Sequence, residues 1–193
     1  MANGNMPRGL VPKRHQSGAP FNGSGETFAV AAGDATPIYI GGLVKMAGTG
    51  DGDYVPTATG NVSTGNRFLG VVMGLHIDGT SEKLYREGGT ATKIIVATDP
   101  DLAFEIQEDS VGGAIPATAI GNVAKLTNMK AGDTGYGHSQ MMIDSSTVTA
   151  AGTGVEDVLL VGLVQRPDNE PGEHAKWIVR LLKHEYHNTN TGS

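Results

Sequence analysis

The sequence predicts an all-β protein, a single β-barrel or β-sandwich domain with an extended N-terminal arm and long glycine-rich loops. Within short segments, apolar and polar residues alternate with a period of two, which is typical of half-buried strands. Glycine accounts for 29 of the 193 residues, about twice its usual share, and it indicates many turns because no Gly-X-Y period accompanies it. No window of 12 or more residues shows a clear helical period.

Residues 1–25 are expected to form the extended arm. Pro7, Pro12 and Pro20 oppose a helix and remove backbone donors, while five glycines add conformational freedom. A segment of this composition has no core of its own, so it is ordered only where something holds it in place. A disordered tail is the alternative interpretation of these residues.

Residues 26–186 are expected to form the β domain, and residues 187–193 a flexible C-terminal tail. Turn-rich stretches of Gly, Asn, Asp, Pro and Ser separate the apolar runs. Seven or eight short strands spaced in this way favour a barrel or a sandwich. The candidate strands are residues 37–46, 67–78, 92–99, 102–109, 122–128, 140–146, 157–166 and 175–186.

Alternation within these runs predicts which side chains face the core. In the first run the even positions from Ile38 to Met46 share one face. In the second run the odd positions from Leu69 to Ile77 do the same. Such a long period-two pattern predicts that each of these strands has one buried face and one polar face.

Three later runs complete the predicted core. The run LAFEIQED directs Phe104 and Ile106 inward, and it leaves Glu105 and Gln107 on the outer face. The run DVLLVGLVQR is apolar on both faces and is therefore placed centrally in the sheet. The run AKWIVRLLKHEY closes the core, and Trp177 is expected to pack there rather than stack on a ligand, because it buries a large area.

Charge and hydropathy exclude several kinds of partner. The formal net charge is −6, yet the arm holds Arg8, Lys13 and Arg14 and no carboxylate, so the remainder has 11 basic and 20 acidic side chains. This acidic body repels phosphates, and we expect no nucleic-acid partner. The longest apolar run, Val158–Val164, is far shorter than a membrane span, and no signal-peptide run precedes it, so we expect no membrane partner and synthesis in a cytosol.

Patterns for metal ligands and nucleophiles are incomplete. His184 and His187 are three residues apart near the end of an expected strand, where they point to opposite faces rather than to one metal ion. Asp51 and Asp53 alternate in a loop but lack the further ligands of a calcium-binding EF-hand. Cysteine is absent, which removes disulfides and thiolate chemistry. We expect no metal, no cofactor and no catalytic residue.

A run of carboxylates is the remaining candidate for enzymatic chemistry. Paired carboxylates are typical of glycoside hydrolases, whose clefts also hold several aromatic side chains. Here the alternation turns the one nearby aromatic residue inward, so a solvated strand edge or a subunit contact is the favoured interpretation. The run comprises Asp99, Asp101, Glu105, Glu108 and Asp109.

Both ends of the chain resemble a known class of proteins. The stretches MANGNMPRGLVPKRHQSGAPFNG and GLVQRPDNEPGEHAKWIVRLLKH are similar to small structural proteins of tailed bacteriophages, which are encoded beside the major capsid protein. The middle stretches LGVVMGL and LYREGGTATKIIVATDPDLAFEIQEDSVGG are also similar, so the resemblance spans roughly residues 1–183. The loops GTGDGDYVPTATGNVSTG and NMKAGDTGYGHSQ match least.

The resemblance implies a capsid cement or decoration protein, which lies on the exterior of the assembled phage head and bridges subunits of the major capsid protein. Such proteins are β-rich, carry extended arms and are commonly trimers, although dimers and monomers occur. We therefore expect a non-enzymatic virion protein that is made in the host cytoplasm. A homo-oligomer is expected, a trimer rather than a dimer, because a small domain with a modest core benefits from burial against copies of itself.

The arm is the expected contact with the partner protein. Its basic side chains would pair with carboxylates, which fixes orientation more than affinity. Its prolines would reduce the entropy lost on docking. Whether the arm meets the capsid or a sister subunit stays open. The predicted partner-binding residues are Pro7, Arg8, Pro12, Lys13, Arg14 and His15.

Two other functions stay as alternatives. One is another structural component of the phage head or tail. The second is a carbohydrate- or surface-binding module, which normally exposes a row of aromatic side chains, whereas Tyr39, Tyr54, Tyr85 and Tyr136 are scattered along this chain.

Overall fold

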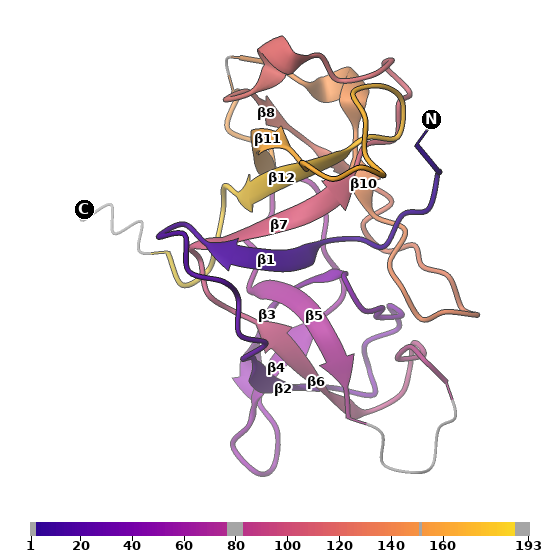
Figure 1. Ribbon diagram of the computed structural model, residues 1–193. Coiled ribbons are helices and arrows are strands. Elements are labelled where there is room, and N and C mark those ends of the chain that lie inside the picture. Colours follow the sequence, from indigo (N-terminus) through magenta and orange to yellow (C-terminus); the bar gives the residue numbers. More distant parts are fainter. Residues whose placement is uncertain (1–2, 77–82, 151, 188–193) are drawn as a thin grey trace.

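The computed structural model describes residues 3–76, 83–150 and 152–187. These residues form an all-β fold in which a closed five-stranded barrel lies beneath an open five-stranded sheet (Figure 1). The predicted all-β class is therefore confirmed. The expected position of Ile77 in a strand lies outside the described residues, as does the expected tail apart from His187.

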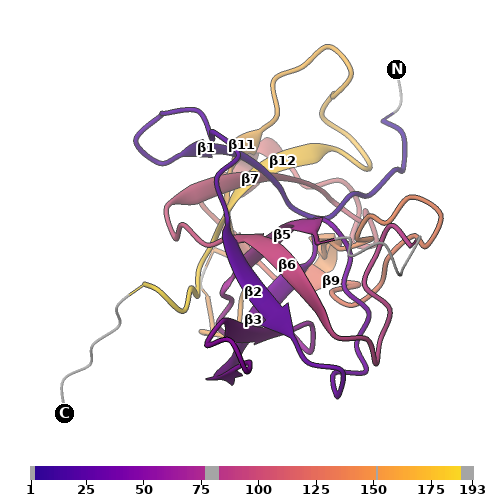
Figure 2. The same cartoon turned by 90° about the horizontal axis from the view of Figure 1, so that it is seen from below.

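The barrel is closed by a single parallel contact between two strands. Ala29 pairs with Thr57 in parallel, and all other neighbouring strands of the barrel are antiparallel. The view from below in Figure 2 shows these strands around the lower half of the molecule. In barrel order the strands are β2 (Glu26–Val30), β4 (Pro56–Thr59), β3 (Leu43–Gly50), β5 (Gly70–Leu75) and β6 (Thr92–Ala97).

The open sheet is antiparallel throughout, and it joins the first strand of the chain to the last one. Its order is β1 (Val11–His15), β7 (Leu102–Gln107), β12 (Lys176–Leu181), β11 (Val158–Leu163) and β8 (Val123–Ala124). Strand β11 lies between β12 and the two-residue edge strand β8, so it is an inner strand but not the central one that its two apolar faces predict; β12 holds the centre. Edge strand β1 runs along the side of the sheet that is nearest the barrel in Figure 1.

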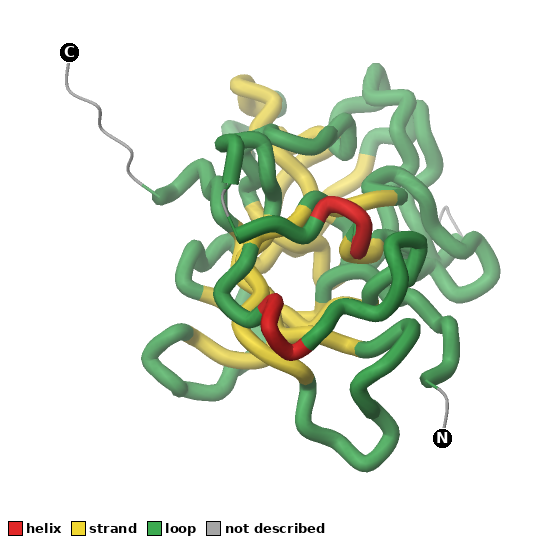
Figure 3. The backbone as a smooth tube through the Cα atoms, turned by 90° about the horizontal axis from the view of Figure 1, so that it is seen from above, coloured by secondary structure: helices red, strands yellow, loops and turns green. Residues whose placement is uncertain are grey.

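Short elements and loops cover the far end of the sheet. β9 (Leu126–Thr127) and β10 (Met142–Ile143) pair as a separate ribbon. The 3₁₀ turns η1 (Ala117–Ala119) and η2 (Ser145–Thr147) are the helical segments of the described residues, and Figure 3 shows them among long loops. The low helix content agrees with the absence of a helical period in the sequence.

The barrel strands serve two hydrophobic cores, because successive side chains of a strand point to opposite faces. In β3, Val44 lies in the core inside the barrel, and Leu43 lies in a second core that the barrel shares with the sheet. In β6, Val96 and Ala97 are divided in the same way. We call these the barrel core and the shared core. The open sheet supplies Leu102, Phe104, Ile106, Val158, Leu160, Trp177, Val179 and Leu181 to the shared core.

Strand β5 differs from the single buried face that the sequence predicts. Leu69 lies in the barrel core and Val71 in the shared core, although they are two residues apart. Gly70 separates them, and a Cβ atom there would lie 2.0 Å from the carbonyl oxygen of Ala97. The backbones therefore approach more closely than any larger residue permits. A bulge between Val72 and Gly74 again changes which residues of β5 face each side of the strand.

Three strands lie where the sequence analysis placed none. β2 precedes the first predicted run, β4 lies in a stretch assigned to turns, and β1 lies within the expected arm. Each is only four or five residues long, which is too short for its alternation to be recognised. Each is held by hydrogen bonds to a partner strand, and the partner of β1 is distant in the chain, since His15 pairs with Leu102, 87 residues later.

Truncating the core tryptophan should destabilise the fold. Trp177 is 2% exposed and belongs to the shared core. We expect Trp177→Ala to lower the free energy of unfolding by about 3–5 kcal/mol, measured by urea denaturation, because it removes a large buried side chain and leaves a cavity. Tyr136→Ala is the control, since Tyr136 is 75% exposed and should change stability little. Equal stability of the two variants would contradict this assignment.

Candidate functional site

The N-terminal segment is ordered against the chain's own sheet. Strand β1 pairs antiparallel with β7, from Val11 opposite Glu105 to His15 opposite Leu102. Pro12 fits this position because an edge strand leaves one side without sheet partners, where a missing N–H group is tolerated. The predicted arm is extended, but its central part is the outermost strand of the sheet rather than a separate tether.

Polar contacts fix the residues before β1. The backbone N–H of Met6 donates to Oε1 of Gln107 at 3.0 Å, and Nε2 of Gln107 donates to Oδ1 of Asn5 at 2.8 Å. Asn3 donates to the carbonyl oxygen of Glu170 at 2.9 Å and accepts from the backbone N–H of the same residue at 3.0 Å. Leu10 is buried in the shared core. The segment from Asn3 onward is thus tied to both β7 and the loop before β12.

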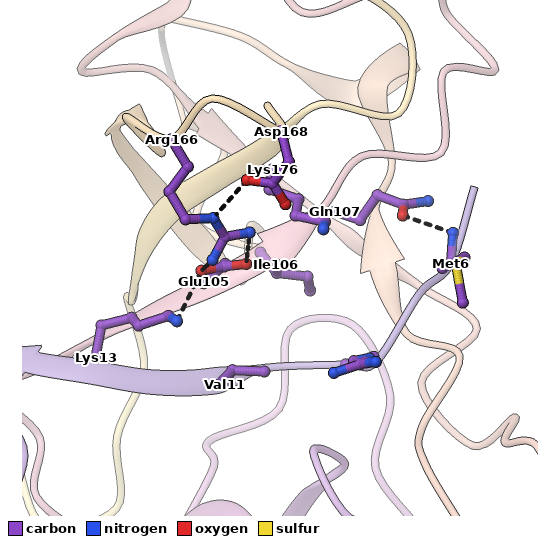
Figure 4. A pocket seen from close by; sticks show the side chains of 11 residues that line it. Met6, Val11, Lys13, Glu105, Ile106, Gln107, Arg166, Asp168 and Lys176 are labelled. Carbon is purple, nitrogen blue, oxygen red and sulfur yellow. Dashed lines mark hydrogen bonds and ion pairs between the residues drawn. The ribbon is translucent and has the colours of Figure 1, made fainter. Parts of the chain in front are cut away.

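Glu105 is the centre of the ionic contacts that hold β1. Its carboxylate accepts two hydrogen bonds from the guanidinium of Arg166, at 2.9 and 3.0 Å, and forms an ion pair with Nζ of Lys13 at 2.9 Å (Figure 4). Nε of Arg166 donates to Asp168 at 3.0 Å. The hydrogen bond from Arg166 lowers the pKa of Asp168.

A cleft of about 360 Å³ opens around these residues. Its floor is the outer face of β7, and its walls are the N-terminal segment on one side and β12 with the loop at Arg166 on the other (Figure 4). We call it the Glu105 cleft. Its lining residues are Met6, Arg8, Gly9, Val11, Lys13, Glu105, Ile106, Gln107, Arg166, Asp168 and Lys176.

The six predicted partner-binding residues do not form one cluster. Arg8 and Lys13 line the Glu105 cleft, whereas Arg14 does not, and its side chain is exposed. His15 forms an ion pair with Asp99 through Nδ1 at 2.8 Å when it is protonated. Pro7 and Pro12 are half-buried. Within the described part of the chain, the side chains of Arg8 and Arg14 make no hydrogen bond or ion pair.

The run of carboxylates after β6 is dispersed over separate contacts. Asp101 pairs with Arg180 at 3.4 Å. Asp109 accepts from the backbone and hydroxyl of Ser145, both at 3.0 Å, and so joins two loops. Together with the ionic contacts of Asp99 and Glu105, these bonds give each carboxylate a local structural partner rather than a common cleft.

Glu108 is a buried carboxyl group at the end of β7. Burial raises its pKa from 4.5 to about 7, even though Oε2 accepts a hydrogen bond from the backbone N–H of Ile115 at 2.8 Å. Oε1 is buried and has no hydrogen-bond partner among the described residues. Glu108 therefore titrates near neutral pH inside the protein.

Neither candidate metal pattern forms a site in the structure. His184 is buried, its Nδ1 accepts from the backbone N–H of Tyr186 at 3.1 Å, and burial lowers its pKa, whereas His187 is exposed. Asp51 uses Oδ1 to accept from the backbone of Asp53 and organises its own turn. No group of three or more His, Cys, Asp or Glu in the described ranges is arranged to hold a metal ion.

The tyrosines do not form a common surface. Tyr39 stacks on Tyr85 with ring centroids 4.9 Å apart, and Tyr39 is buried. Tyr54 and Tyr136 lie in different loops and are exposed.

Arg166 and Lys176 are parts of this site that the sequence did not predict. Arg166 is the last residue of one predicted strand and Lys176 the second residue of the next, on either side of a turn-rich stretch. Alternation did place Glu105 and Gln107 on the outer face of β7, but it did not reveal that the N-terminal segment and Arg166 cover them. In the structure only 8% of Glu105 and 3% of Gln107 are exposed, and Glu105 is buried with ion-pair partners whereas Gln107 is buried with hydrogen-bond partners.

Comparison with known proteins gives no match. No protein-family model, no curated protein and no solved structure matches this chain. In the described ranges, no helix has the length and apolar character needed to cross a membrane.

Removing the charge at position 105 should loosen β1. We expect Glu105→Gln to lower the free energy of unfolding by about 2 kcal/mol, because two cations lose a nearly buried hydrogen-bonded counter-ion. Asp168→Asn is the matched control, since it contacts the same Arg166 but its side chain is 65% exposed, and its loss should cost less than about 0.5 kcal/mol. Chemical denaturation measures both. Similar losses in the two variants would be inconsistent with a central role for Glu105.

Glu108 should make stability depend on pH. Its pKa is about 7 in the folded protein and 4.5 ordinarily, so the unfolded chain ionises first as the pH rises. The folded state therefore loses stability between pH 4.5 and 7 and regains it as the pH falls through this range. Glu108→Gln removes this contribution, so the free energy of unfolding of the variant should increase relative to wild type as the pH rises. A pH-independent difference in denaturation experiments would rule this out.

Proposed function

We propose that this protein is a non-enzymatic structural protein of a tailed-phage virion. In this proposal it is a capsid cement or decoration protein that binds the outside of the assembled head and bridges subunits of the major capsid protein. The resemblance of both ends of the chain to such proteins supports this function. Another structural component of the phage head or tail is the alternative.

One structural observation carries the proposal. The basic N-terminal segment lies across the surface of an otherwise acidic protein, and it exposes Arg8 and Arg14 without engaging either side chain internally. Two uncompensated cations on an ordered backbone suit a partner that presents carboxylates. The same residues on a disordered tail would offer the charges without a defined geometry.

The order of this segment changes how the binding would work. A disordered arm loses conformational entropy when it docks, whereas a segment already paired with β7 loses little. The partner would therefore meet a preformed edge. A protein that binds only the assembled shell stabilises it by mass action, by roughly 4 kcal/mol per site at a concentration 1,000 times the dissociation constant. Assembly as a trimer would multiply these contacts and remains part of the proposal.

Charge reversal in the N-terminal segment tests this function. Combined Arg8→Glu and Arg14→Glu substitutions should weaken co-sedimentation with assembled, expanded phage heads by roughly tenfold at low salt, because two attractive contacts become repulsive. Lys130→Glu is the control, since this exposed lysine lies in a loop outside the segment. Point variants are preferable to deletion of the segment, because deletion would expose the edge of β7.

The outcomes are distinct. Equal binding by the double variant and the control would remove the N-terminal segment from the interface. Failure of the wild-type protein to bind heads, or its location inside the shell in an electron-microscopy map, would overturn the capsid function.

A further inference from the structure

We propose that the Glu105 cleft is a binding site for a pair of carboxylate side chains from a partner protein. This inference takes from the proposed function only that the chain binds another protein. It does not require that partner to be a capsid subunit. It names the chemistry of the contact and the two side chains that would make it, Arg8 and Lys176.

The charges in the cleft are unbalanced. Four cations line it against two carboxylates, although the protein as a whole carries a net charge of −6. The two carboxylates are Glu105 and Asp168, and both are already bonded to Arg166. The excess positive charge is therefore concentrated in one concave place on an acidic molecule, where it favours an incoming anion.

The four cations differ in their remaining capacity to bind. Arg166 directs Nε and both terminal nitrogens to its own carboxylates, and Lys13 is paired with Glu105. Arg8 and Lys176 line the same cleft, and their side chains make no hydrogen bond or ion pair with the residues that the structure describes, although the charge of Lys176 also acts on Asp168 and helps to lower its pKa. These two donors are available to a ligand without breaking an internal contact.

Sheet pairing and close packing fix the backbone positions of Lys176 and Arg8. Lys176 is the first residue of β12 and pairs with Gln107 of β7 in the sheet. Arg8 precedes Gly9, where a Cβ atom would lie 2.3 Å from the carbonyl oxygen of Gly41, so the backbone at this point is packed closely against the chain before β3. A ligand therefore meets two side chains whose backbone positions on opposite walls are fixed, so binding has to order only the side chains themselves.

The composition of the cleft favours carboxylates over phosphate. Two incoming carboxylates would balance the four cations, with one for each unpaired donor. A phosphate group carries a similar total charge at a single point, whereas two carboxylates distribute it between the donors of the two walls and away from Glu105 and Asp168. A volume of about 360 Å³ accommodates short acidic side chains.

A titration of the isolated protein tests this site. The ¹⁵N-labelled protein is titrated with the blocked peptide Gly-Asp-Glu-Gly and, separately, with Gly-Asn-Gln-Gly, succinate and inorganic phosphate. We expect the acidic peptide to shift the backbone amide signals around Glu105, Gln107 and Lys176 saturably, and the neutral peptide to leave them unchanged. Affinity for the acidic peptide should fall as salt is added.

Substitutions identify the donors. Arg8→Gln and Lys176→Gln should each weaken binding of the acidic peptide by roughly three- to fivefold, as expected for partly exposed charge pairs. Arg14→Gln is the matched control, since it removes an equally unpaired, exposed arginine that does not line the cleft. Thermal denaturation verifies that the three variants are folded.

The contrary outcomes of the titration and of the substitutions contradict different parts of the proposal. Absence of shifts with the acidic peptide, or equal weakening by Arg14→Gln, overturns the site. Tighter binding of phosphate overturns the preference for carboxylates, and tighter binding of succinate overturns the protein source of the ligand. Peptide binding without binding to heads would contradict the capsid function alone, whereas binding to heads without peptide binding would contradict the cleft alone.

Discussion

The alternation of side chains along the barrel strands is the constraint on which this fold depends. In a barrel, each strand normally buries only the face that points into the barrel. Here Leu43, Val71 and Ala97 make the outer face of the barrel hydrophobic as well. That surface must be covered, and the inner face of the open sheet covers it. The sheet therefore has a fixed position over the barrel, and Trp177 at its centre packs into the core that both share.

The position of the sheet in turn decides the fate of the basic N-terminal segment. With β12 on one side of β7, the other side would be an open edge, and β1 covers it. Glu105 then lies between β1 and the Arg166 loop, so one carboxylate joins the first part of the chain to the last part. The Glu105 cleft follows from this arrangement, because its two walls come from segments that only the sheet brings together.

Features that depend on a single strand could be predicted from the sequence. The inward direction of Phe104 and Ile106 and the burial of Trp177 follow from local alternation and were predicted correctly. The split of Leu69 and Val71 between two cores was not predicted, because it depends on the close approach of Gly70 to a neighbouring strand. The short strands β1, β2 and β4 escaped notice for a similar reason, since distant partners define them.

The sequence by itself determined the all-β class, the outward position of Glu105 and the basic character of the N-terminal segment, because period-two hydrophobicity and charge are local properties. Only the tertiary structure decided that this segment is an edge strand, that Lys13 and Arg166 share Glu105, and that a cationic cleft forms beside them. Arg166 lies 61 residues from Glu105 in the chain. No local pattern encodes such a pairing, because it arises only when the open sheet brings β7 and the loop of Arg166 together.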